Sequence, residues 1–307
     1  MKTFFFLLIQ KTRLSALAVG SFAILCGPLA ASAAESAPSA QKPVRILASF
    51  YPMYVMALNI AGDIPGVQVE CLTEPFAGCL HDYSLTTGNM KKLAKADIFV
   101  ANGAGMESFL DKALGQNPSL RIIEASKGIK LAHPGNAHVW VSISGAIEQT
   151  QSIARQLAEV DPAHAADYRR NADAYCDKLK ALRAEMRAGL DGIKNRDIIT
   201  FHEAFPYFAS EFNLRIVGVI EREPGSEPNA RELAETVQTI KKHNVRALFA
   251  EPQYPAKCAK VIERETGVPV GILDPAVTGP MEPAKARDSY LEAMRANLAT
   301  LRKALAN

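Results

Sequence analysis

The segment over residues 161–193 constrains the fold more than any other part of this sequence. It opens with Asp161 as N-cap and Pro162 at the first helical position, a pattern typical of a helix start, and no proline follows within it. Apolar residues recur in it at helical spacing among good helix formers. They are Tyr168, Ala172, Tyr175, Leu179, Leu182, Met186 and Leu190. At about 1.5 Å per residue this helix would span about 50 Å, which is wider than a small compact domain. We therefore expect it to join two bodies.

Short apolar runs alternate with helical segments on both sides of this helix, a pattern typical of parallel sheets covered by helices. The predicted strands are 44–50, 67–72, 97–101 and 121–124 before the helix, and 197–201, 215–220, 247–250 and 268–273 after it. The predicted helices are 52–61, 87–95, 106–114, 143–159, 203–211, 229–243, 255–266 and 283–306. The predicted fold class is α/β, with an N-terminal lobe over 43–160 and a C-terminal lobe over 195–307. Each lobe has a central parallel sheet flanked by helices, and one long rigid helix over 161–194 bridges them. This pattern argues against an ordinary surface helix or a coiled-coil arm.

The first residues have the organisation of an export signal. Basic residues flank a largely apolar stretch over 14–29, and a small-x-small motif follows at 31–33. The apolar stretch is interrupted by Gly and Pro and is shorter than the about 20 residues that span a membrane. We predict a cleaved Sec-type signal peptide over 1–33, a disordered linker over 34–42 and a periplasmic protein. Lipoprotein anchoring at Cys26 is the less favoured alternative, because a leucine precedes this cysteine.

The other cysteines are Cys71, Cys79, Cys176 and Cys258. In an oxidising compartment they can form disulfides, and four cysteines allow three pairings. Cys71 and Cys79 flank a turn-like segment, so this is the preferred pair. The other two are either free and buried or bridged to each other, and the sequence leaves both alternatives open.

Composition excludes one class of partner. The chain has 307 residues and a net charge of +3, and its basic residues form no run. Nucleic acid is therefore not an expected partner. The length suits two domains, each with its own core, and we expect a monomer.

The candidate binding residues lie where parallel strands end. His81 follows the second predicted strand, and His202 and Asp274 end the first and last strands of the second lobe. His138 lies in a loop at 136–140 that also holds the single tryptophan. Ligands bind beyond the carboxyl ends of parallel strands, so these residues converge if the two lobes face each other. Three imidazoles and one carboxylate suit Zn²⁺.

The motifs around these residues resemble the metal-binding cluster (A-I) of ABC-transporter solute-binding proteins, in particular its zinc-uptake members. Residues 78–83 match the family's Gly, then His-x-Tyr pattern. Residues 136–140 match Asn-Pro-His-x-Trp, with Ala137 in place of proline, and residues 202–208 match His-x-Ala-Phe-x-Tyr-Phe. The resemblance covers essentially the whole chain after the signal.

The resemblance implies that His81, His138, His202 and Asp274 bind the metal. It also implies two α/β lobes bridged by a rigid helix, with a divalent ion captured in the cleft between them. The protein would deliver this ion to the membrane subunits of an ABC permease.

Some positions depart from the family pattern. Ser142 replaces the usual aspartate after the second histidine, and His133 stands alone where many zinc members have a His-rich loop. His133 is either a transient metal contact or a plain surface histidine. Cys79 is a possible metal ligand, although a disulfide with Cys71 is favoured.

The identity of the ion depends on the third ligand. A carboxylate there would favour Mn²⁺, whereas His202 supplies nitrogen and favours Zn²⁺; Mn²⁺ and iron stay open as alternatives. Glu203 and Glu251 either orient imidazole N–H groups or have structural roles. Metal affinity should fall in acid, because ligation requires neutral imidazoles.

Three rival functions remain. A zinc hydrolase could use Glu203 or Glu251 as general base, but Asp274 would fill the position that an activated water needs, and the sequence has no HExxH motif. An adhesin would be an added role at most, because no adhesive repeat is visible. A protein that binds an organic ligand or iron chelate would need basic or aromatic cleft residues rather than four metal ligands. We therefore predict no enzymatic activity.

Overall fold

The computed structural model describes residues 42–75, 80, 83–115, 117–220, 230–252 and 257–305. Several of the predictions lie outside these residues. They are the signal peptide, residues 34–41 of the linker, His81, Cys79 and the side chain of Cys258. Residues 42–307 form one compact unit. Within the described ranges, no helix combines the length and the apolar character needed to cross a membrane.

Two parallel sheets form the framework, which confirms the predicted α/β class. The first sheet has the order β2-β1-β3-β4, and the second has the equivalent order β6-β5-β7-β8. The strands of the first sheet are β1 Val44–Ala48, β2 Val67–Cys71, β3 Ile98–Ala101 and β4 Arg121–Glu124. Those of the second are β5 Asp197–Thr200, β6 Arg215–Val219, β7 Leu248–Ala250 and β8 Val270–Ile272. In each sheet the chain leaves the first strand towards one edge and later crosses to the other.

The helices lie close to the predicted positions. They are α1 Tyr51–Ala61, α2 Thr87–Lys95, α3 Asp111–Leu114, α4 Ile143–Val160, α5 Ala165–Leu190, α6 Pro206–Glu211, α7 Ala230–His243, α8 Lys257–Thr266 and α9 Pro283–Leu305. Short 3₁₀ turns occupy Ser108–Leu110, Val139–Val141 and Pro162–His164. The bridging helix, predicted over 161–193, consists of the last of these turns followed by α5.

The helix predicted over 106–114 is wrong in its first half. Gly103, Ala104 and Gly105 all have left-handed φ angles, of 73°, 54° and 88°, so the chain turns sharply after β3. The buried carboxylate of Glu107 accepts hydrogen bonds from the backbone N–H groups of Asn102 and Gly103. These bonds hold the turn closed, and only a 3₁₀ turn and the short α3 follow.

Each sheet has two buried faces, which the alternation of its residues defines. In β1, Ile46 lies in the central core, whereas Leu47 packs on the outer face beneath α2. In β5, Ile198 lies in the central core, and Ile199 packs on the outer face with residues of α7 and α8. The central core runs from the first sheet to the second through α1, α4, α5 and α9. The two lobes therefore share one core.

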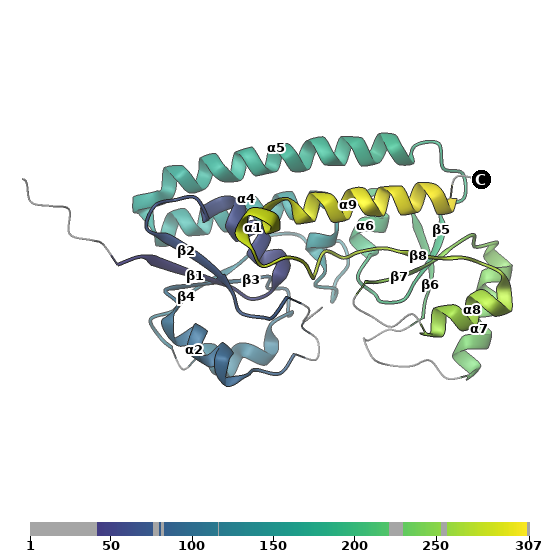
Figure 1. Ribbon diagram of the computed structural model, residues 1–307, viewed down its shortest axis with the longest axis horizontal. Coiled ribbons are helices and arrows are strands. Elements are labelled where there is room, and N and C mark those ends of the chain that lie inside the picture. The colour runs from purple at the N-terminus through teal and green to yellow at the C-terminus, as the bar shows by residue number, and fades with distance from the viewer. Residues whose placement is uncertain are drawn as a thin grey trace, which may run out of the picture. The chain divides into compact units, whose positions relative to one another are not determined.

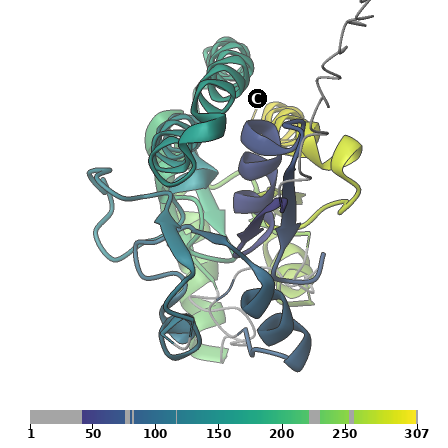
Figure 2. The ribbon, with the colours of Figure 1, turned by 90° about the vertical axis from the view of Figure 1, so that its left-hand side faces the viewer.

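Two helices, rather than one, span both lobes. α5 buries every residue of the predicted apolar stripe and packs against α1, α4 and α9. α9 contacts α1 in the first lobe and β8 in the second, and it runs beside α5 (Figures 1 and 2). The connection from β8 to α9 returns to the first lobe, where the hydroxyl of Tyr54 on α1 donates to the carbonyl of Met281 at 2.8 Å. The sequence indicated α9 as a helix but not this bridging role.

Asp161 lies at the predicted N-cap position, but its side chain makes no capping hydrogen bond. Its carboxylate instead accepts a hydrogen bond from the hydroxyl of Tyr168 at 2.7 Å and lies 2.7 Å from Nδ1 of His164. Burial and the nearby Asp161 charge raise the pKa of Tyr168. The start of the bridging helix is therefore stabilised by contacts one and two turns further along.

The predicted disulfide between Cys71 and Cys79 is wrong in this structure, because Cys71 is a free thiol. Cys71 ends β2 with its side chain in the central core, and its Sγ lies 3.6 Å from Oγ1 of Thr73. Cys176 is likewise free and buried, which agrees with one of the two alternatives that the sequence left open for it. Burial raises the pKa of each thiol to about 11. Both cysteines therefore act as small apolar residues.

The apolar stripe of α5 gives a stability test. Leu179 is fully buried, so Leu179→Ala should lower the free energy of unfolding by about 2–5 kcal/mol. Arg187 is exposed on the same helix, so Arg187→Ala should change it by less than about 0.5 kcal/mol. Urea unfolding followed by circular dichroism measures both. Equal stability of the two variants would show that this face of α5 is not part of the core.

Candidate metal centre

His202 and Glu251 come together at the carboxyl edge of the second sheet. β5 and β7 are neighbours there, and the chain leaves them in opposite directions, an arrangement that opens a crevice at the strand ends. His202 follows β5, and Glu251 follows β7. Nδ1 of His202 lies 3.2 Å from Oε1 of Glu251, and both side chains are buried. A carboxylate at this position orients the imidazole and stabilises a proton on Nδ1.

His138 reaches the same place from the first lobe. Its ring meets the ring of His202 edge to face, with centroids 4.9 Å apart. Oδ1 of Asn136 accepts a hydrogen bond from the backbone N–H of His138 at 3.0 Å and lies 3.1 Å from Nδ1 of its ring. An acceptor at Nδ1 favours the tautomer whose lone pair is on Nε2, the nitrogen that then can bind a metal.

Asp274 follows β8 at the edge of the second sheet. Its Oδ1 accepts a hydrogen bond from the backbone N–H of Ala276 at 2.7 Å. Burial raises the pKa of Asp274, the Ala276 hydrogen bond lowers it, and the charge of Glu251 raises it. The charge of Glu251, which lies beside His202, thus also acts on the carboxyl group of Asp274.

The structure brings together part of the predicted ligand set. Among the described residues, no three His, Cys, Asp or Glu side chains form a group that could hold a metal ion. The structure brings His138 and His202 into contact and places Asp274 near Glu251. His81 lies outside the described residues, so the four-ligand site remains a prediction.

Trp140 ties the His138 loop to the segment that carries Asp274. Its Nε1 donates to the carbonyl of Pro275 at 2.9 Å, and its own carbonyl accepts from the hydroxyl of Tyr290 on α9 at 2.8 Å. The ring of His138 lies against the indole, with centroids 5.2 Å apart. The single tryptophan therefore positions a first-lobe loop against the second lobe.

Further polar contacts hold this loop to α6 and its neighbours. The amide of Asn136 donates to the carbonyl of Glu203 at 2.7 Å, and the hydroxyl of Tyr207 donates to the carbonyl of Asn136 at 2.9 Å. Nε2 of His133 lies 2.9 Å from Oγ of Ser210. The side chain of Glu203 is exposed, so Glu251 rather than Glu203 orients an imidazole here. His133 has the contacts of a surface histidine.

A buried polar network that the sequence did not indicate supports the loop from the first sheet. Oε1 of Glu107 accepts from the hydroxyl of Ser49 at 2.8 Å and from the backbone N–H of Asn102 at 2.8 Å. The amide of Asn102 donates to the carbonyl of Ala137 at 3.0 Å and accepts from Gln149 at 2.7 Å. Ala137, which replaces the family's proline, is thus held through its carbonyl by Asn102, at the end of β3. The network joins residues distant in sequence and leaves no periodic signal.

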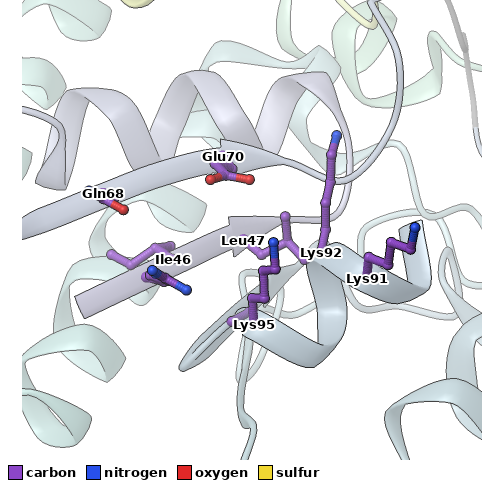
Figure 3. A pocket seen from close by; sticks show the side chains of 9 residues that line it. Ile46, Leu47, Gln68, Glu70, Lys91, Lys92 and Lys95 are labelled. Atoms are coloured by element: carbon purple, nitrogen blue, oxygen red, sulfur yellow. The ribbon is translucent and has the colours of Figure 1, made fainter. Parts of the chain in front are cut away.

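A hollow of about 220 Å³ in the first lobe lies away from this centre (Figure 3). It lies beside Arg45, Ile46 and Leu47 of β1 and beside the last turns of α2. Arg45, Gln68, Glu70, Lys91, Lys92 and Lys95 line it. Nζ of Lys92 donates to the carbonyl of Cys71 at 2.8 Å, and its charge, with that of Lys95, offsets the negative end of the α2 dipole. These lysines therefore have a structural role.

The family described as zinc-uptake complex component A, periplasmic, matches residues 46–304. The chain belongs to this family. The predicted resemblance to zinc-uptake solute-binding proteins is thereby confirmed.

The chain is also similar to individual proteins of known name and to solved structures. The zinc-binding lipoprotein AdcA of Streptococcus pneumoniae is 28% identical over 88% of this chain and 58% of its own length. The iron-binding protein YfeA of Yersinia pestis is 30% identical over 78% of this chain and 80% of its own length. The solved structure of the solute-binding protein FpvC of Pseudomonas aeruginosa, in complex with Ni²⁺, is 32% identical and covers 86% of this chain and 97% of its own, with a TM-score of 0.77. The chain thus spans little more than half of AdcA.

The burial of Asp274 gives a pH test in the metal-free protein. The pKa of Asp274 is higher in the folded protein than in the unfolded chain. The protonated carboxyl group therefore favours the folded state below the ordinary Asp pKa, and this contribution to stability is lost as the pH rises through the raised pKa. Asp274→Asn should therefore raise the melting temperature at about pH 7, and the gain should shrink towards about pH 4. Calorimetry with a chelator present measures this. An asparagine variant that is less stable than wild type at both pH values would contradict it.

Proposed function

We propose that this protein is an extracytoplasmic solute-binding protein that captures a divalent transition metal, Zn²⁺ first, between its lobes and delivers it to an ABC permease. Membership of the zinc-uptake family supports the class of protein. The contact between the rings of His138 and His202 carries the proposal for this chain. It joins two imidazoles from different lobes at a sheet edge where ligands bind.

The proposed ligands are His81, His138, His202 and Asp274. Three imidazole nitrogens and one carboxylate oxygen match the four-coordinate sites that zinc prefers. Glu251 would hold the ring of His202 in the orientation for ligation. The name of the AdcA relative supports zinc as cargo.

A manganese- or iron-binding protein of the same class is the second candidate. The similarity to the iron-binding protein YfeA favours it, as does the similarity to FpvC, which has been solved in complex with Mn²⁺. A zinc-dependent hydrolase is less favoured. Asp274 as fourth ligand would close the coordination that a metal-activated water needs, so we propose that the protein is not an enzyme.

Location, partners and domain organisation belong to the same proposal. The family description names a periplasmic component, which fits an exported protein with a signal peptide over 1–33 and a linker over 34–42. The partners are the membrane subunits of the permease, and the protein acts as a monomer. The lobes are 43–160 and 195–307 around the helix at 161–194. Contacts of α5 and α9 with both lobes favour small lobe movements on binding.

Zinc titration of the chelator-treated protein tests the proposal. The wild type should bind one Zn²⁺. Glu251→Gln should lower the affinity by roughly 10- to 100-fold, because it weakens the group that orients an imidazole, and His202→Ala should lower it further. His133→Ala is the matched control, since that histidine bonds to Ser210 and should keep the wild-type affinity. Calorimetry in competition with a chelator measures all four proteins. An unchanged affinity of His202→Ala would remove this residue from the site.

A further inference from the structure

Asn297 on α9 holds the backbone of Asp274 at two points. Its Oδ1 accepts from the backbone N–H of Asp274 at 2.7 Å, and its Nδ2 donates to the carbonyl of Asp274 at 2.8 Å. Asn297 is only 1% exposed. Among the described residues β8 is the edge strand of its sheet, and no further described strand lies beside Asp274, which comes just after its end. The amide of Asn297 pairs with Asp274 as a neighbouring strand would.

The carboxylate of Asp274 is also held by its own backbone. Its Oδ1 accepts from the N–H of Ala276, which has a left-handed φ of 58°. A residue with a Cβ adopts this conformation at a cost, so the turn is maintained by its surroundings. Because Oδ1 already accepts this hydrogen bond, Oδ2 is the oxygen more open to a ligand.

The turn is fixed from the first lobe as well. Nε1 of Trp140 donates to the carbonyl of Pro275, and the ring of Pro275 restricts its own φ. The turn that follows Asp274 is therefore held by α9, by the His138 loop and by its own side chain.

We propose that Asn297 is a positioning residue that presents Asp274 as a one-oxygen ligand and so favours Zn²⁺ over Mn²⁺. The inference rests on the proposed function, since it concerns the same site. One oxygen and three imidazoles complete a four-coordinate zinc site. Mn²⁺ prefers more oxygen ligands. If the backbone of Asp274 were released, its carboxylate could turn to offer both oxygens, which would weaken zinc binding more than manganese binding.

Asn297→Leu tests this, because it keeps the branching at Cγ and removes both hydrogen bonds. It should weaken Zn²⁺ binding by roughly 10- to 100-fold, weaken Mn²⁺ binding less, and so narrow the ratio of the two affinities. In the metal-free protein, the amide of Asp274 should exchange with deuterium oxide faster than in the wild type. Asn297→Ser is the milder variant if the leucine variant folds poorly.

Asn59→Leu is the matched control. The amide of Asn59 donates to the carbonyl of Arg287, so it joins α1 to α9 without touching Asp274. This variant should keep the wild-type ratio of Zn²⁺ to Mn²⁺ affinity even if its melting temperature falls as far as that of Asn297→Leu.

Two outcomes would overturn the positioning role. One is a folded Asn297 variant whose ratio of Zn²⁺ to Mn²⁺ affinity lies within twofold of the wild-type ratio. The other is a change of this ratio in Asn59→Leu that is as large as the change in Asn297→Leu. A wild type that binds no zinc, or Asp274→Ala with unchanged binding, would instead refute the proposed function. The amide exchange is measured without metal, so it tests the hold on Asp274 in either case.

Discussion

A single hydrophobic core joins the two sheets, and the candidate metal centre depends on it. Side chains from α1, α5 and α9 fill the space between the lobes, together with Ile46 from the first sheet and Phe249 from the second. Separating the lobes would expose this surface to water at about 25 cal/mol per Å² of apolar area. The edges of the two sheets are therefore held in place before any ligand arrives. His138 and His202 can remain in contact because the shared core holds the two lobes together, so that no lobe closure is needed to bring the two rings to each other.

The two sheets have equivalent strand orders but use equivalent places differently. In the second sheet, the ends of β5 and β7 carry His202 and Glu251, which have the chemistry of a ligand and its orienting partner. In the first sheet, the ends of β1 and β3 carry Ser49 and Asn102, which bond to buried Glu107. This network supports the loop that brings His138 across. In the second lobe the candidate residues His202 and Asp274 thus follow strand ends, whereas in the first lobe the network supports the loop that carries His138.

Local patterns predicted the fold well, because strands and helices depend on neighbouring residues. α2 begins and ends as predicted, and the stripe on α5 is buried as expected. Contacts between distant residues left no such signal. Asn297 lies 23 positions from Asp274, and nothing local marks it as a partner of that residue. Cys71 shows the opposite error, since its spacing from a turn suggested a disulfide but its side chain faces the core.

The crystal structure of the zinc-loaded protein, with anomalous scattering recorded at the zinc edge, tests the central claim most directly. We expect one strong peak between the lobes, from an ion bonded at about 2.0–2.2 Å to the imidazoles of His81, His138 and His202 and to one oxygen of Asp274. Zinc on the outer surface, or in the cleft with no bond to His138 and His202, would contradict it.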